Sequence, residues 1–203
     1  MWWRAILGGA DSVLLVVRHG RTAVNAAGLL LGRQDPPLDE VGVAQADAIA
    51  RTLGPVDHLV SSPLGRCRET AERISAETSE VDERWIELDY GEFDGRPFGD
   101  LPAGTWDRWR SDVTFTPPGG ESLATLGRRV RSALEEVGPR AVEGTVAVVT
   151  HVSPIKAALA WALGVGDEVA WRAHVTPASI TRIRVSGGGP VLVGFNDVAH
   201  LDD

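Results

Sequence analysis

The stretch VLLVVRHGRTAVN, residues Val13 to Asn25, joins an apolar strand to a polar turn. Its five apolar residues, Val13 to Val17, form a continuous run that is typical of a strand covered on both faces in a parallel sheet. Such a strand delivers the next residues to the carboxyl edge of the sheet, where open α/β folds bind ligands. The residues delivered here are Arg18, His19 and Gly20, a cation, an imidazole and a residue that allows close backbone approach. The stretch therefore predicts a site that holds an anion against an imidazole.

The composition is that of a globular protein with one core. The chain has 203 residues, 43% of them hydrophobic, so we expect a single domain over residues 1–203, with residues 1–12 as an N-terminal arm. The net charge of −8 argues against a surface for nucleic acid or for an anionic membrane. The one cysteine, Cys67, excludes an internal disulfide framework and fits a reducing compartment, which predicts a cytoplasmic location.

Apolar periodicity along the rest of the chain alternates between helix and strand. The pattern predicts helices over residues 39–53, 63–77, 122–137 and 153–163, and strands over 58–60, near 81, and over 146–150, 180–185 and 191–195. Ser62-Pro63 and Ser153-Pro154 each look like an N-cap followed by a proline, and Gly138-Pro139 is expected to end its helix. The alternation indicates an α/β fold, a three-layer αβα sandwich with a mainly parallel central sheet.

Residues 88–121 differ from their surroundings. They are rich in Gly, Pro, Asp and Trp and show little periodicity except around Trp106 to Arg110. A segment of this length without clear elements is usually functional or mobile, so we expect it to be variable and to face the substrate.

Three strand-to-helix junctions carry the candidate functional side chains. The first ends in Arg18 and His19, the second opens a helix that carries Arg66, and a late strand ends in His151. In a parallel sheet these junctions share one edge, where helix N-termini also favour anions. Two guanidiniums and two imidazoles would meet there, which suits a phosphoryl group because its transition state spreads charge over the equatorial oxygens.

Five ordered blocks of sequence resemble the histidine phosphatase superfamily, also called the phosphoglycerate mutase-like family. The blocks are Arg18-His19-Gly20 with Thr22 and Asn25, followed by Gly32, Asp35 and Pro37-Leu38; Ser61 to Leu64 with Arg66, Thr70 and Ala71; Glu87 with Gly91 and Gly95; Pro118 to Ser122; and Val148 to His151. The match covers about Val13 to Phe195, and five blocks in order are a far stronger signal than a lone Arg-His-Gly. The resemblance implies a phosphoglycerate mutase-like fold and favours the phosphatase branch.

The resemblance also implies roles for the matching residues. His19 would be the nucleophile that becomes phosphohistidine, and Glu87 would protonate the leaving oxygen and later deprotonate the attacking water. The phosphoryl oxygens would be bound by Arg18, Arg66 and His151. Substrate contacts are expected from Asn25, Gly32 and Val152. The scheme requires no metal and no cofactor, and the partner is a small phosphorylated substrate.

These roles set physical requirements. A nucleophilic imidazole must be unprotonated at its attacking nitrogen, so the other nitrogen of His19 needs a fixed acceptor. His151 is more useful as a cation stabilised by the anionic substrate, and Glu87 must carry a proton before the first step.

Two features of the sequence qualify this interpretation. The family commonly has glycines after the second histidine, whereas this chain has His151-Val152-Ser153-Pro154, so the backbone there is expected to follow another path. The segment Cys67 to Arg73 fits the Cys-x5-Arg pattern of cysteine phosphatases. Its intervening residues read as helix and include two glutamates that repel an anion, so we treat this match as chance.

Several alternatives stay open at this point. Asp89, Glu92 and Asp94 are carboxylates close to Glu87 and could take the role of the acid. The leading function is a metal-independent phosphomonoester hydrolase, and its alternatives are a cofactor-dependent phosphoglycerate mutase and an inactive member that binds a phosphorylated ligand. Mutases usually have a longer basic insert after the acid block, which favours the phosphatase. The sequence leaves homodimer formation open.

Overall fold

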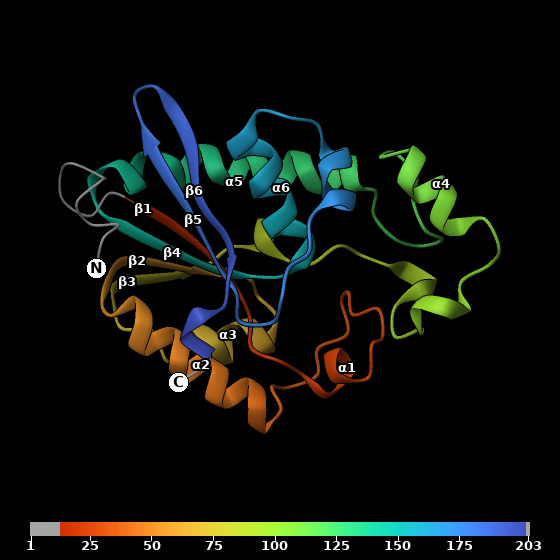
Figure 1. Cartoon of the computed structure of the whole chain (residues 1–203), viewed down its shortest axis with the longest axis horizontal. Coiled ribbons are helices and arrows are strands. Elements are labelled where there is room, and N and C mark those ends of the chain that lie inside the picture. Colours follow the sequence, from red (N-terminus) through yellow and green to blue (C-terminus); the bar gives the residue numbers. More distant parts are fainter. Residues whose placement is uncertain (1–12, 202–203) are drawn as a thin grey trace.

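A six-stranded sheet forms the middle layer of the molecule in the computed structural model, which describes residues 13–201 (Figure 1). Its strands are β1 (Val13–Arg18), β2 (Val56–Ser61), β3 (Ala76–Val81), β4 (Thr145–Thr150), β5 (Ile180–Ser186) and β6 (Gly189–Asp197). The spatial order is β3-β2-β4-β1-β5-β6. Strands β1 to β4 are parallel to one another, and β5 runs antiparallel to both of its neighbours, β1 and β6. The expected N-terminal arm, residues 1–12, lies outside the described residues.

Helices cover both faces of this sheet. In Figure 1, α5 (Leu123–Glu143) and α6 (Val152–Leu163) lie above the sheet, and α2 (Glu40–Leu53) and α3 (Gly65–Ala71) lie below it. Each layer of helices closes a separate apolar cluster against the sheet. The sequence-based prediction of a three-layer αβα sandwich with a mainly parallel sheet is therefore confirmed.

The central strands are apolar because both of their faces are covered. Val16 and Val17 of β1 and Val148 and Val149 of β4 are all fully buried, although neighbours in each pair point to opposite faces. Burial of each such side chain contributes about 1.5–3 kcal/mol. These strands thus form the rigid base on which the junctions of the candidate site are built.

The strand register brings the predicted junctions level with each other. Arg18 at the end of β1 pairs with Thr150 at the end of β4, and Ser61 at the end of β2 pairs with Val149. The residues that follow all three strands therefore leave the sheet at the same edge.

Helix α5 is longer than the sequence predicts. It begins at the expected cap, where Ser122 accepts from the backbone N–H of Thr125, but it passes through Gly138-Pro139 and ends at Glu143. Gly138 has no Cβ to meet the ring of Pro139, so it tolerates the helical conformation before a proline. Ala141 is fully buried beyond the proline, and this packing helps to offset the helical cost of Pro139.

Helix α3 is shorter than predicted. It spans Gly65–Ala71 instead of 63–77, and Leu64 rather than Ser62 occupies the N-cap position. The hydroxyl of Ser62 lies 2.7 Å from Nε2 of His151, a tertiary contact that a local cap pattern does not reveal. Residues 72–75 form a turn, and strand β3 (Ala76–Val81) takes up the last two residues of the predicted helix.

Helix α6 begins two residues earlier than its cap pattern predicts. Its first residue is Val152 and His151 occupies the N-cap position, so Ser153 and Pro154 lie within the first turn. The catalytic candidate therefore takes the position that the pattern assigned to Ser153.

Short elements connect these layers. They are α1 (Ala23–Ala26), α4 (Thr105–Ser111) and the 3-10 turns η2 (Glu83–Trp85), η3 (Gly91–Phe93), η4 (Phe98–Asp100), η5 (Asp167–Arg172) and η6 (Ala199–Leu201). The segment 88–121 contains η3, η4 and α4, with Trp109 almost fully buried among other aromatic rings. No helix within residues 13–201 is long and apolar enough to cross a membrane.

Candidate active site

His19 is held at the end of β1 in one tautomer. Its backbone N–H donates to the carbonyl of Thr150 over 3.0 Å, and its Nδ1 lies 2.7 Å from the carbonyl oxygen of Gly20. A carbonyl can only accept, so this contact assigns the proton to Nδ1 and leaves a lone pair on Nε2. Burial lowers the pKa of His19 well below its usual value, and Arg66 and Arg18 add to this effect against the opposing hydrogen bond to Gly20. His19 is therefore a neutral imidazole with Nε2 as its basic atom.

Gly20 is needed because another backbone passes close to it. A Cβ at this position would lie 2.3 Å from the carbonyl oxygen of Gly42 in α2. The N–H of Gly20 donates to the hydroxyl of Thr70 in α3, over 3.1 Å. The turn after β1 is thereby fixed to both helices of the lower layer.

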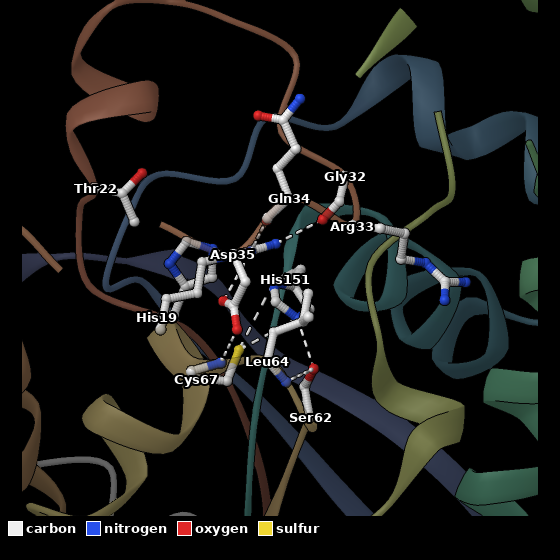
Figure 2. A network of polar contacts seen from close by, with 12 residues as sticks. His19, Thr22, Gly32, Arg33, Gln34, Asp35, Ser62, Leu64, Cys67 and His151 are labelled. Carbon is white, nitrogen blue, oxygen red and sulfur yellow. Dashed lines mark hydrogen bonds and ion pairs between the residues drawn. The ribbon is translucent and has the colours of Figure 1, made fainter. Parts of the chain in front are cut away.

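Arg66 is fully buried, and its guanidinium contacts the imidazole of His19. Its Nε donates to Nε2 of His19 over 3.2 Å, and its two terminal nitrogens donate to the carbonyls of Gln34 (2.7 Å) and Gly32 (2.9 Å). Figure 2 shows the loop residues Gly32, Gln34 and Asp35 gathered beside His19. The loop carbonyls thus fix the guanidinium against the imidazole.

Asp94 organises the loop that holds Arg66. Its carboxylate accepts from three consecutive backbone N–H groups, those of Gly32, Arg33 and Gln34, over 2.8–2.9 Å. Asp94 was considered from the sequence as an alternative acid, and this supporting position was missed. No local pattern could have revealed it, because the contacts join residues about 60 positions apart.

Arg18 reaches into the site from the last position of β1. One terminal nitrogen donates to the carbonyl of Val175 over 2.7 Å, whereas its buried Nε has no hydrogen-bond partner among residues 13–201. Burial lowers the pKa of Arg18 to about 10, although Glu87 opposes the shift. An unpaired donor on a buried cation is costly, so an anion in the cavity would stabilise this group.

His151 lies against His19 on the inner side of the site. The two rings meet edge to face with their centroids 5.1 Å apart, and Nε2 of His151 contacts the hydroxyl of Ser62 and, at 3.4 Å, the sulfur of Cys67 (Figure 2). Burial lowers the pKa of His151 well below its usual value, and Arg66 reinforces the effect. The surroundings of the ring by themselves favour its neutral form, and a cationic His151 stabilised by the anionic substrate stays a prediction.

Glu87 is fixed at the N-terminus of α6. Its Oε1 accepts from the N–H groups of Leu88 (2.7 Å) and Ser153 (3.1 Å), and its Oε2 accepts from that of Val152 (3.0 Å). These contacts fix the position and orientation of the carboxyl group beside His151 and the cavity. The alternative acids are placed elsewhere, since Asp89 caps the N–H of Gly91, while Glu92 is exposed.

The departure from glycines after the second histidine has a local explanation. Val152 is the first residue of α6, so it needs only a helical conformation, which valine adopts. Its N–H donates to Glu87 and Val152 lines the cavity, so the expected contact with substrate stays a prediction. Gly32, the other backbone candidate, does not line the cavity and uses its N–H and carbonyl on Asp94 and Arg66.

Asn25 caps a short helix and also lines the cavity. Thr22 and Asn25 form a capping box around α1, in which each side chain accepts from the backbone N–H of the other residue. The side chain of Asn25 also lines the cavity. Its fixed orientation suits a polar contact with a ligand.

A cavity of about 450 Å³ opens in front of His19. Arg18, His19 and Glu87 line its inner end, with Asn25 at the side. Aromatic residues from two segments, Tyr90, Phe98, Trp106, Trp109 and Trp171, line the cavity together with aliphatic residues such as Leu30 and Leu123. Trp106 stacks on Trp109 at 5.7 Å, and Trp171 meets Trp109 edge-on at 6.1 Å. Arg66 and His151 do not line this cavity and lie against His19 instead.

The model of the histidine phosphatase superfamily (branch 1) matches residues 14–198. The chain belongs to this superfamily. A histidine phosphatase fold also occurs in a phosphoserine phosphatase from Entamoeba histolytica, solved as a mutant in complex with phosphoserine. That structure aligns with a TM-score of 0.86 and 26% identity over 93% of this chain and 98% of its own.

Curated relatives of this chain have varied names. The bifunctional protein Rv2228c of Mycobacterium tuberculosis is 37% identical over 85% of this chain, and the chain spans about half the length of that relative (50%). The "Probable phosphoglycerate mutase GpmB" of Yersinia pestis is 32% identical over 92% of this chain and 94% of its own. Among the described residues, no group of three or more His, Cys, Asp or Glu side chains could hold a metal ion.

Proposed function

We propose that this protein is a metal-independent phosphomonoester hydrolase that acts on a small phosphorylated metabolite through a phosphohistidine intermediate on His19. Membership of the superfamily and the likeness to a phosphoserine phosphatase support a phosphoryl-transfer enzyme of the hydrolase type. The observation that carries the proposal is the state of His19, a neutral imidazole whose Nδ1 is bound to a carbonyl and whose Nε2 stands between a guanidinium and the cavity.

In the first step, the Nε–H of Arg66 exchanges its hydrogen bond to Nε2 of His19 for one to a phosphoryl oxygen, and the lone pair freed on Nε2 attacks the phosphorus atom of the ester. The bond from phosphorus to the leaving oxygen breaks, and this oxygen takes a proton from Glu87 as the alcohol departs. Arg18 and Arg66 balance the charge on the phosphoryl oxygens, which is the main source of rate enhancement for such a reaction. The arriving anion also favours protonation of His151, which then becomes a third cation.

In the second step, the Glu87 carboxylate takes a proton from water, and the water oxygen attacks the phosphorus atom. The bond between phosphorus and Nε2 breaks and inorganic phosphate leaves, which restores the neutral imidazole of His19 and protonated Glu87. The carboxylate is well placed for both transfers because three backbone N–H groups hold it beside the cavity.

Turnover of 4-nitrophenyl phosphate in the presence of a chelator tests the proposal. We expect activity in the wild-type protein and its loss in His19→Ala. Acid quenching during turnover should trap an acid-labile phosphoprotein, as phosphohistidine requires. A phosphoprotein stable to acid would contradict the role of His19, and chelator-sensitive activity would contradict the metal-independent scheme.

Assays with phosphoglycerates, together with a measurement of phosphate-ester binding, separate the two alternatives. A mutase, which the name of the Yersinia relative suggests, would interconvert phosphoglycerates faster than it releases inorganic phosphate. An inactive ligand-binding member would show neither reaction and would still bind phosphate esters.

A further inference from the structure

Lys156 is the single lysine of the chain, and its other 19 basic residues of the Lys and Arg types are arginines. It lies on α6 and its side chain lines the cavity in front of His19. A lysine is a compact charge on a flexible stem, whereas arginine presents a planar fork, so the two are not interchangeable in a binding site.

The direction of Lys156 follows from helix geometry. Val152 and Lys156 are one turn apart, so both side chains share the face of α6 that lines the cavity. Helical side chains lean towards the N-terminus, which lays the stem of Lys156 over the first turn, where Glu87 is bound. The ammonium therefore belongs to the inner half of the cavity.

Lys156 has no protein partner there. Within the described part of the chain, no hydrogen bond or ion pair of its ammonium is found. Burial lowers the pKa of Lys156 from its usual value, and Glu87 opposes this shift more strongly than Arg18 supports it. A partly buried cation without a partner is unfavourable, so an anion that binds beside it stabilises the site.

The charges of the cavity leave a place for that anion. When Glu87 is protonated for the first step, Arg18, Arg66 and the protonated His151 already outnumber the two charges of a phosphoryl dianion, so the phosphoryl group does not need Lys156. Lys156 then remains as an unmatched positive charge. The volume of about 450 Å³ is of the size that holds a whole metabolite, so the leaving group also fits inside.

We propose that Lys156 binds a carboxylate on the alcohol part of the substrate, so that the preferred substrates are phosphomonoesters of hydroxy acids. This inference rests on the proposed function, since it names the substrate class of the same cavity. Lys156 is then a specificity-determining residue that discriminates between leaving groups and takes no part in bond making.

Matched pairs of esters test the inference. 3-Phosphoglycerate and glycerol 3-phosphate differ by a carboxylate in place of a hydroxymethyl group, and 4-carboxyphenyl phosphate and phenyl phosphate are a pair that suits the aromatic wall. For each pair, the ratio of kcat/KM for the acid to that for the neutral ester is measured in the wild type and in Lys156→Met. We expect the ratio in at least one pair to fall about 10- to 100-fold in the variant, the usual effect of losing a charged hydrogen bond.

Two further variants provide controls. Lys156→Arg keeps the positive charge and should restore most of the ratio. Arg172→Met removes an equal charge from an exposed residue of η5 that does not line the cavity, and it should leave the ratio unchanged. If Lys156→Met lowers kcat/KM for both members of every pair by the same factor, Lys156 acts on Glu87 or on the phosphoryl group and the inference is wrong.

A binding experiment keeps this inference separate from the proposed function. Titration calorimetry of His19→Ala, with and without Lys156→Met, measures Kd for the same esters without turnover. Weaker binding of the acid alone in the double variant supports the inference even if the wild type hydrolyses no ester, an outcome that would overturn only the phosphatase. Equal Kd values in the two backgrounds overturn the role of Lys156.

Discussion

At the scale of single residues, the site depends on partners that lie far away in sequence. His19 is fixed by its own neighbour Gly20, but its lone pair meets Arg66, which in turn is held by loop carbonyls and by the turn that Asp94 organises. The sequence motifs are sufficient to propose candidate residues such as His19 and Arg66, because each motif is local. The supporting contacts could not, since they depend on how segments pack.

The proposed acid makes a prediction at this scale. Glu87→Gln should lower kcat by about 10²–10⁴-fold for alkyl phosphates, whose leaving oxygen needs a proton, and by much less for 4-nitrophenyl phosphate. Glu92→Gln, a change at an exposed carboxylate a few residues away, should alter neither rate. Equal losses for the two types of ester would show that Glu87 does not act on the leaving group.

Asp94 makes a second prediction. Asp94→Asn replaces one acceptor oxygen by a donor that faces backbone N–H groups, so we expect a loss of about 1–3 kcal/mol in the free energy of unfolding. Because the loop also holds Arg66, kcat/KM should fall as well. Urea unfolding and ester turnover measure the two effects, and Asp100→Asn in the exposed turn η4 is the matched control. A variant with normal stability and activity would contradict the supporting role.

At the scale of elements, periodicity predicted which segments are helices better than where they end. The sequence predicts the apolar face of α5 correctly, but it predicts an end at residue 137, six residues before the observed end at Glu143. The start of α3 was misplaced because the hydroxyl of Ser62 serves His151. In both cases a tertiary interaction overrides a local signal.

The pair Gly138 and Pro139 allows a test of this explanation. Pro139→Ala should raise the free energy of unfolding by about 1–2 kcal/mol because it restores a helical hydrogen bond, offset in part by a freer unfolded chain. Gly138→Ala alone should destabilise α5, since its Cβ meets the proline ring. In the background of Pro139→Ala the same change should stabilise, because the nearest atom to the new Cβ is a Val185 methyl at an ordinary 3.9 Å. Thermal or urea unfolding measures the free energy of unfolding of the two single variants and the double variant. If the effects of Gly138→Ala and Pro139→Ala on that free energy simply add, the proline ring is not the reason for Gly138.

At the scale of the whole molecule, the layered fold and the convergence of the junctions were predictable from the sequence. Buried apolar strands followed by charged residues are sufficient to place Arg18, His19 and His151 at one sheet edge. The aromatic wall was not predictable, because it combines residues of 88–121 with Trp171 of η5. Sequence patterns contain no information about which distant segments share a cavity.

The two buried histidines make the stability of the whole molecule depend on pH. Their pKa values in the folded state lie well below the unfolded value of about 6.5. Below that pH the two histidines therefore bind protons in the unfolded chain and stay unprotonated in the folded chain. Stability should therefore be complete above about pH 6.5 and fall on acidification, by up to about 1.4 kcal/mol per pH unit for each histidine. Urea unfolding between pH 7.5 and 5 should show a shallower slope in His19→Asn/His151→Asn, and an unchanged slope would contradict this account.

The stacked indoles of the cavity wall give the protein a built-in optical reporter. Trp106, Trp109 and Trp171 are three of the seven tryptophans of the chain, and all three line the space that a substrate would occupy. Indole emission shifts in colour and intensity when water around a ring is replaced by a solute. Intrinsic fluorescence should therefore follow occupancy directly, so that unlabelled candidate metabolites can be screened in a plate reader without waiting for turnover.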